Sequence, residues 1–365
     1  MPDRKSDSNI QKARAPESSA IVGDIRRMIE ETRSSVALTV NVNLTMLYWR
    51  IGKRINEEIL KGDRAEYGKK IVLLLSQRLA EEYGNNFSEK NLRRMMQFAE
   101  VFSNEGIVVS LIRQLSWTHF LALIPLKKPL QREFYAEMCR VERWSVRTLR
   151  KNIDSMLYER TAISRKPEEL VSKELAKLRN EGHLSPNMIL KDPYVLDFLG
   201  VKDRYYEKDL EDAILREMEA FILELGAGFT FLARQKRIQV DNDDFYIDLL
   251  FYNRKLCRLV AVELKLDDFK PADKDQMELY LRWLEKYESE PNENPPLGII
   301  LCAGKKQEQI ELLELGKSDI HVAEYWTALP PKELMQKKLH AAIQHARMRL
   351  DNRITEDIPG DGGAE

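Results

Sequence analysis

The chain has 365 residues, of which 43% are hydrophobic and 32% are charged, so it can hold two globular domains. No apolar run is long enough to cross a bilayer, and we expect no membrane partner. The three cysteines are scattered along the sequence, which excludes a zinc cluster built from thiolates and indicates a reducing, cytoplasmic environment.

The net charge of −1 conceals two halves of opposite sign. Residues 1–165 hold 29 Lys and Arg against 20 Asp and Glu, which gives +9, and residues 166–365 hold 29 against 39, which gives −10. The basic half is suited to binding a polyanion such as nucleic acid. Any single charged patch could equally be a solvated helix face.

Residues 1–19 are polar and are expected to form a disordered leader. From residue 20 to 165 apolar side chains recur every three or four residues, which predicts an all-helical domain. The first helix includes Ile25 and Ile29, and the next is expected over residues 44–60. Ser88 and Ser145 are placed as N-caps of later helices.

Basic side chains gather near the end of this helical half. Arg143, Arg147, Arg150 and Lys151 follow one another at steps that predict a shared helix face. Helix-turn-helix proteins present such a basic helix to DNA. We therefore expect these four residues to bind nucleic acid, through either a groove or the phosphates.

Residues 166–200 have the prolines and charge of a connector, and strand-like patterns follow it. A helix over residues 215–225 is followed by strands expected at 229–232, 238–240, 297–303 and 320–325, with a last helix over 331–350 and a disordered tail from residue 357. Strands mixed with helices in this order predict an α+β or mixed α/β fold with a sheet flanked by helices.

A predicted β-hairpin carries the ionisable residues of greatest interest. Its strands are residues 245–252, with Asp248 inside, and residues 259–265, where Glu263 and Lys265 lie two apart and share a face. Burying such groups is costly without a partner, and carboxylate oxygens suit Mg²⁺ or Mn²⁺. An exposed ion pair on an edge strand is the alternative, but the apolar run around Glu263 favours a strand buried on both faces.

The order of these residues resembles the PD-(D/E)XK nuclease superfamily: a helix glutamate, then Asp248, then Glu263-Leu264-Lys265, then Gln276 four residues before Tyr280. One position differs, because Ile247 stands where the proline that gives the superfamily its name is expected. Further motifs, among them Ser116-Trp117-Thr118-His119 and Lys191-Asp192-Pro193-Tyr194, are similar to those of YhcG-type bacterial proteins, in which a helical domain precedes a PD-(D/E)XK domain. The resemblance covers roughly residues 20–345 and implies a restriction-endonuclease-like sheet in the second half.

The resemblance also implies roles for individual residues. Asp248, Glu263 and the Leu264 carbonyl would hold the cation, Lys265 would orient the nucleophile or neutralise charge, and Gln276 would contact a phosphate or a water. Glu219 is the expected helix glutamate, with Glu217 and Glu224 as alternatives, and Gln235 is expected to line the cleft and contact nucleic acid. The domains implied are a leader (1–19), a helical domain (20–165), a connector (166–200), a nuclease domain (201–335) and a C-terminal helix with its tail (336–365).

The function expected is metal-dependent hydrolysis of phosphodiester bonds in nucleic acid, with DNA as the first choice of substrate. Two alternatives remain open: an RNA-cleaving toxin, and a nucleic-acid-binding or assembly factor whose nuclease fold is not catalytic. The sequence also leaves room for a homo-oligomer.

Overall fold

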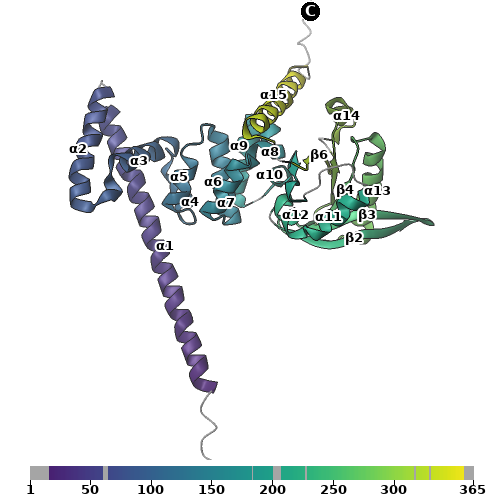
Figure 1. The fold of residues 1–365 in the computed structure, drawn as a ribbon, viewed down its shortest axis with the longest axis horizontal. Coiled ribbons are helices and arrows are strands. Elements are labelled where there is room, and N and C mark those ends of the chain that lie inside the picture. Colours follow the sequence, from purple (N-terminus) through teal and green to yellow (C-terminus); the bar gives the residue numbers. More distant parts are fainter. Residues whose placement is uncertain are drawn as a thin grey trace, which may run out of the picture. The chain divides into compact units, whose positions relative to one another are not determined.

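The computed structural model describes residues 16–60, 65–182, 184–199, 207–226, 228–315, 318–328 and 330–356 (Figure 1). The chain divides into two compact units, residues 1–132 and 133–365. Residues 1–15 of the predicted leader (1–19) and the predicted tail from residue 357 lie outside the described residues, whereas residues 16–19 belong to helix α1. Among the described helices, none combines the length and apolarity that a bilayer crossing requires.

The first unit is helical, as predicted. Its helices are α1 Pro16–Leu60, α2 Ala65–Tyr83, α3 Glu89–Val101, α4 Glu105–Ile112, α5 Trp117–Leu123 and the start of α6 Pro129–Glu142, with a short 3₁₀ turn at Asn85–Phe87. The two helices expected across residues 21–60 form one continuous helix, α1. Its C-terminal half packs on α3, where Trp49 is buried and donates a hydrogen bond of 2.8 Å to the Phe102 carbonyl.

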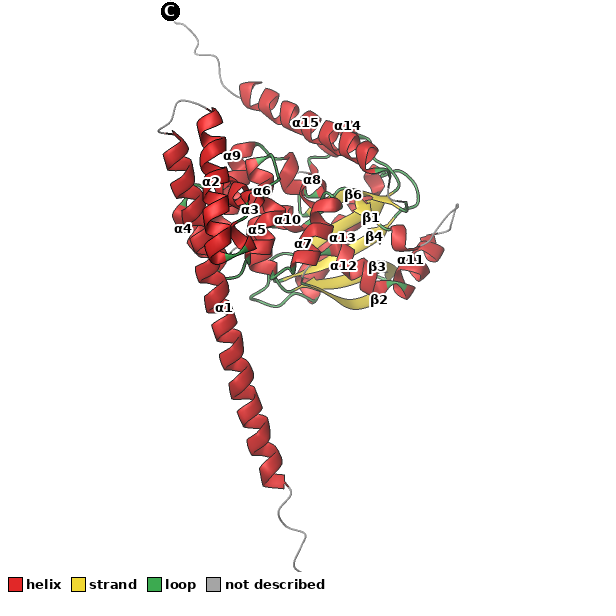
Figure 2. Ribbon diagram, turned by 60° about the vertical axis from the view of Figure 1, so that its left-hand side comes forward, coloured by secondary structure: helices red, strands yellow, loops and turns green. Residues whose placement is uncertain are grey.

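The second unit combines helices with a sheet (Figure 2). After α6, its helices are α7 Val146–Asp154, α8 Leu157–Arg160, α9 Glu168–Glu181, α10 Pro186–Ile189, α11 Glu207–Arg216, α12 Met218–Leu225, α13 Pro271–Tyr287, α14 Gln307–Leu312 and α15 Lys332–Glu356, with 3₁₀ turns at Ala162–Arg165 and Asp197–Leu199. Its strands are β1 Tyr194–Val195, β2 Phe229–Val240, β3 Asp243–Asn253, β4 Arg258–Leu264, β5 Leu297–Cys302 and β6 Ile320–Trp326.

The sheet is mixed, which confirms the predicted fold class. The strand order is β1-β6-β5-β4-β3-β2. The β2–β3 and β3–β4 pairs are antiparallel, whereas β4–β5, β5–β6 and β1–β6 are parallel. Strand β4 therefore has an antiparallel neighbour on one side and a parallel neighbour on the other, and six of its seven residues are buried.

Helices cover both faces of the sheet. On β3, Leu250 packs in a core with Met277 and Leu284 of α13, whereas its neighbour Phe251 contacts Phe221 of α12 with ring centroids 6.1 Å apart. Successive side chains of a strand point to opposite faces. Helices α12 and α13 therefore lie on opposite sides of β3.

The structure corrects three details of the predicted elements. The two short strands expected at 229–232 and 238–240 are one strand, β2, because the polar residues between them continue the pairing with β3. The helix expected over 215–225 begins earlier and breaks at Glu217, between α11 and α12. The sheet also extends into the predicted connector, because β1 pairs with β6.

A buried ionic cluster fixes the segment that precedes β1. The Asp192 carboxylate forms ion pairs with Arg165 and Lys305, and it accepts a hydrogen bond of 3.1 Å from the Glu324 backbone N–H on β6. Although burial opposes ionisation, these two cations hold the pKa of Asp192 well below its usual range. The Lys191-Asp192-Pro193-Tyr194 motif thus has a structural role that its sequence did not reveal.

Changing Asp192→Asn should lower the free energy of unfolding by about 3–5 kcal/mol, because two largely buried cations lose their counter-charge. Chemical denaturation of the full chain measures this decrease. The matched control is Asp319→Asn, whose side chain is 57% exposed and pairs with Arg258 at the surface, so its effect should stay below about 1 kcal/mol. Equal effects of the two changes would contradict this assignment.

Candidate active site

The β3–β4 register brings the two predicted strand acids together. The ladder pairs Leu249 with Val262, and continuing it by one residue sets Asp248 opposite Glu263. There two backbone N–H groups donate to side chains. The Asp248 N–H donates to Glu263 Oε1 at 3.2 Å, and the Leu264 N–H donates to Asp248 Oδ2 at 2.9 Å. The two carboxylates therefore lie side by side where this antiparallel ladder ends.

The charge of Asp248 affects the ionisation of Glu263. Glu263 is buried, with a side chain that is 3% exposed, and burial together with the charge of Asp248 raises the pKa of Glu263 to about 8. Lys265 Nζ lies 3.5 Å from Glu263 Oε2 and offsets part of this effect. Two adjacent acids beside a single lysine leave excess negative charge, which favours the binding of a further cation.

A third acid, which the sequence analysis missed, belongs to the same group. Glu211 on α11 is buried, and its Oε2 accepts a hydrogen bond of 2.8 Å from Gln235 Nε2, which also donates to Asp248 Oδ1 at 3.0 Å. Burial is the main cause that raises the pKa of Glu211. Arg234 Nε lies 2.9 Å from Glu211 Oε1 and forms an ion pair with it.

The structure does not bring the expected helix glutamate to this group. Glu219 and Glu217 are exposed, and Glu224 pairs instead with Arg160 and Lys191. The reason is the break at Glu217, which separates α11, where Glu211 lies, from α12, where Glu219 lies. The sequence contained a signal for Glu211, because it lies beside Leu210 and Ile214 on the buried stripe of α11.

The predicted glutamine, Gln276, lies on helix α13. Gln276 Nε2 donates to the Tyr280 hydroxyl at 2.6 Å, and that hydroxyl donates to the Tyr246 carbonyl on β3 at 3.0 Å. Burial, and then the charge of Glu263, raises the pKa of Tyr280 to about 12. The two side chains form a chain of hydrogen bonds that ends on the strand of Asp248.

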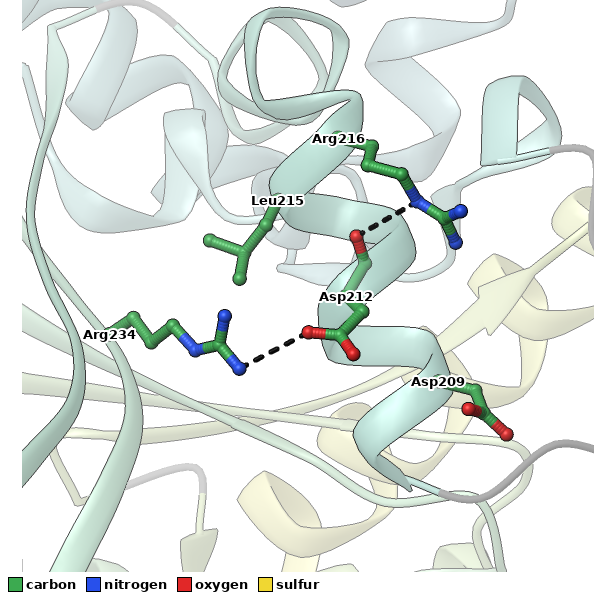
Figure 3. Close-up of a pocket in the computed structure, with 5 residues that line it drawn as sticks. All are labelled: Asp209, Asp212, Leu215, Arg216 and Arg234. Atoms are coloured by element: carbon green, nitrogen blue, oxygen red, sulfur yellow. Dashed lines mark hydrogen bonds and ion pairs between the residues drawn. The ribbon is translucent and has the colours of Figure 1, made fainter.

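A cavity of about 580 Å³ lies beside α11 (Figure 3). Its lining residues are Asp209, Asp212, Leu215, Arg216 and Arg234. Figure 3 shows the Arg234 side chain directed to Asp212, which it contacts at 3.1 Å. Because Arg234 also pairs with Glu211, this arginine connects the cavity to the acid group.

Within the described ranges, no three or more His, Cys, Asp or Glu side chains form a metal-binding group by themselves. The available donors are the oxygens of Asp248 and Glu263, those of Glu211 across Gln235, and the backbone carbonyl of Leu264. All are hard oxygen donors, and Mg²⁺ is commonly held by one or two carboxylates with waters and substrate phosphates completing its shell. The residues present fit such an ion.

The four predicted nucleic-acid-binding residues are all exposed. Arg147, Arg150 and Lys151 lie on α7, which Ser145 caps by accepting a hydrogen bond of 3.1 Å from the Thr148 N–H. Arg143 does not share this helix: it lies in the turn before α7, with a left-handed φ of 52°. The basic surface therefore combines a turn and a helix face.

The similarity to known proteins agrees with this geometry. The chain is 31% identical over 346 residues to the "Putative nuclease YhcG" of Escherichia coli (strain K12), across 86% of this chain and 92% of that protein. The chain belongs to the YhcG family. Residues 24–160 match the DUF1016 N-terminal domain, and residues 187–340 match the YhcG PDDEXK nuclease domain. The second half is therefore a nuclease domain of the PD-(D/E)XK type, and such nucleases generally use divalent metal ions.

Two solved structures share weaker similarity with this YhcG-family chain. One is a repair endonuclease from Pyrococcus abyssi, at 23% identity over 36% of this chain and 50% of that chain, with a TM-score of 0.24. The other is EndoMS bound to double-stranded DNA, at 18% identity over 36% and 48%, also with a TM-score of 0.24. The chain spans about half the length of each, and the family assignment rests on the sequence matches.

The raised pKa of Glu263 predicts how pH changes the stability of the metal-free protein. The folded pKa of about 8 exceeds the ordinary value of 4.5, so the folded state binds more protons between these values and stability should fall as pH rises through this window. Melting temperatures in EDTA from pH 5 to pH 8 measure the fall. Glu263→Gln should flatten it, and a fall of unchanged size in that variant would contradict the assignment.

Proposed function

We propose that the chain is a Mg²⁺-dependent nuclease that hydrolyses phosphodiester bonds, with DNA as its substrate. The observation that carries the proposal is the buried contact between Asp248 and Glu263 with Lys265 beside them. Apolar residues would pack this part of the sheet better than three ionisable groups do. A cation held by the two acids, with the lysine beside it, would attract the negative charge of a phosphodiester.

The cation would be held by Asp248, Glu263 and the Leu264 carbonyl, with Glu211 as the helix glutamate in place of Glu219. A bound divalent ion supplies an activated water and stabilises negative charge on phosphate oxygens. Mn²⁺ is a chemically equivalent occupant because it prefers the same oxygen donors. The raised pKa of Glu263 favours this function, since a cation there would relieve the repulsion between the two acids.

The chain's own side chains would complete the reaction. Lys265, held near Glu263, would orient the attacking water or neutralise charge that develops on the phosphorus oxygens. Gln276 is half-buried and linked to Tyr280, so it would present its remaining polar atoms to a phosphate or a water. Gln235 stays a predicted contact for nucleic acid at the rim of the same site.

Binding of substrate would depend on the exposed cations at Arg143, Arg147, Arg150 and Lys151. These side chains form no ion pair with a described acid, so their charge is available to phosphates. The acidic residues of the second half repel a polyanion, which makes a separate basic surface necessary. The division into a helical binding domain (20–165), a connector (166–200) and a nuclease domain (201–335) is part of this proposal.

The decisive experiment incubates the purified chain with duplex DNA, single-stranded DNA and RNA, each with Mg²⁺ and with EDTA. We expect cleavage of DNA that EDTA abolishes. Preferential cleavage of RNA would favour the ribonuclease alternative. Binding without cleavage of any substrate would favour a non-catalytic assembly factor.

Changing Asp248→Ala should reduce cleavage by roughly two orders of magnitude or more, because the charge stabilisation that a metal ion supplies is worth several kcal/mol. Nucleic-acid binding in EDTA should be unaffected. The matched control is Asp244→Ala on the same strand, an exposed residue that pairs with Arg237, and it should retain full activity. Full-rate cleavage by the Asp248 variant would exclude this mechanism.

Replacing Arg143, Arg147, Arg150 and Lys151 together with glutamine should weaken binding and lower the salt slope by about 0.9 for each duplex phosphate that the variant no longer neutralises. Fluorescence anisotropy across a range of salt concentrations gives this slope. The control changes Lys173 and Lys177 to glutamine, two exposed lysines on α9, and should leave the slope unaltered. Unchanged binding by the fourfold variant would assign α7 a different partner.

A further inference from the structure

Gln235 has a backbone conformation that is unusual for its place in a strand. It lies within β2 with φ at 45°, in the left-handed region that side-chain-bearing residues rarely adopt. The paired register passes without a shift from Arg234 with Leu249 to Lys236 with Ile247, so Gln235 is opposite Asp248. Backbone strain of this kind persists where the surrounding structure enforces it, often at functional sites.

The side chain of Gln235 makes two contacts that explain this conformation. One amide nitrogen, Nε2, donates to Glu211 Oε2 at 2.8 Å and to Asp248 Oδ1 at 3.0 Å. It thereby joins an acid from α11 to an acid from β3. Asp248 Oδ2 is fixed separately by the Leu264 N–H at 2.9 Å, so both oxygens of Asp248 have a donor.

We propose that Gln235 is a positioning residue of the cation site, which holds Glu211 and Asp248 in one orientation through its amide. The inference rests on the proposed metal-dependent function. Donors that contact metal-binding carboxylates fix the ligand orientation without touching the ion. The strained backbone of Gln235 is the cost of bringing one amide within reach of both acids.

A glycine variant separates the effect of the Gln235 side chain from the effect of its backbone strain. Glycine adopts a positive φ without strain, so in Gln235→Gly the relief of strain should offset part of the loss of both hydrogen bonds, and the melting temperature in EDTA should fall only modestly. Mn²⁺ titrated calorimetrically into the full chain, without nucleic acid, should bind about 10–100-fold more weakly than to the unaltered protein. A merely structural role would leave Mn²⁺ affinity unchanged.

Gln239→Gly is the matched control. Gln239 is an exposed glutamine four residues further along β2, and it is not one of the described residues with a positive φ. Glycine there weakens an ordinary strand, so the melting temperature should fall while Mn²⁺ affinity stays the same. The two variants should thus differ in Mn²⁺ affinity, although the melting temperature falls in both. An equal drop in Mn²⁺ affinity in both would overturn the proposal.

A double-mutant cycle with Glu211→Gln tests the link between the two acids. If Gln235 acts by holding Glu211 against Asp248, the decrease in Mn²⁺ affinity of the double variant should be much smaller than the sum of the two single decreases. Additive decreases, or a Gln235→Gly variant that binds Mn²⁺ as tightly as the unaltered chain, would overturn this role and leave the nuclease proposal intact. Failure of the unaltered chain to bind Mn²⁺ would overturn both.

Discussion

The close approach of Asp248 and Glu263 is the constraint on which the site depends. Two carboxylates are held together inside a sheet because the backbone N–H groups at the end of the β3–β4 ladder donate to them instead of to carbonyls. Glu263 cannot move away, since β4 is paired on both sides and buried on both faces. The surrounding groups respond to this charge. Lys265 directly follows β4 and pairs with Glu263, Gln235 of β2 donates to Asp248, and burial together with the charge of Glu263 raises the pKa of Tyr280 on α13.

The sequence predicted the central part of this arrangement because that part depends on local patterns. The two strands of the hairpin, the apolar run of β4 and the spacing of Gln276 from Tyr280 are local properties of the sequence, and the structure contains each of them. The helical first half followed from its periodicity in the same way. The parallel strands β5 and β6 were also predictable, because their apolar runs are bounded by polar turns.

What the sequence did not predict depends on contacts between distant segments. Glu211 is a site residue only because α11 packs on the sheet and Gln235 spans the space between them, whereas Glu219 follows a break in the helix that periodicity did not locate. Strand β1 has two residues, too few for a pattern, and is defined by its pairing with β6 and by the ionic cluster of Asp192. The sequence motif around Lys191 therefore marked a structural junction rather than a reactive group.

The clusters around Asp192 and around Glu263 differ in whether the protein balances their buried charge. Asp192 has two cations within the fold, so its negative charge is matched and its pKa lies below the usual range. Glu263 has one lysine and a neighbouring acid, so the charge of its site is not matched by the protein and its pKa rises to about 8. A cluster whose charge is balanced stabilises the fold, and a cluster with excess negative charge is stabilised by a cation from solution. This difference is the physical basis for the proposal that a metal ion binds at Asp248 and Glu263 rather than at the cluster of Asp192 beside β1.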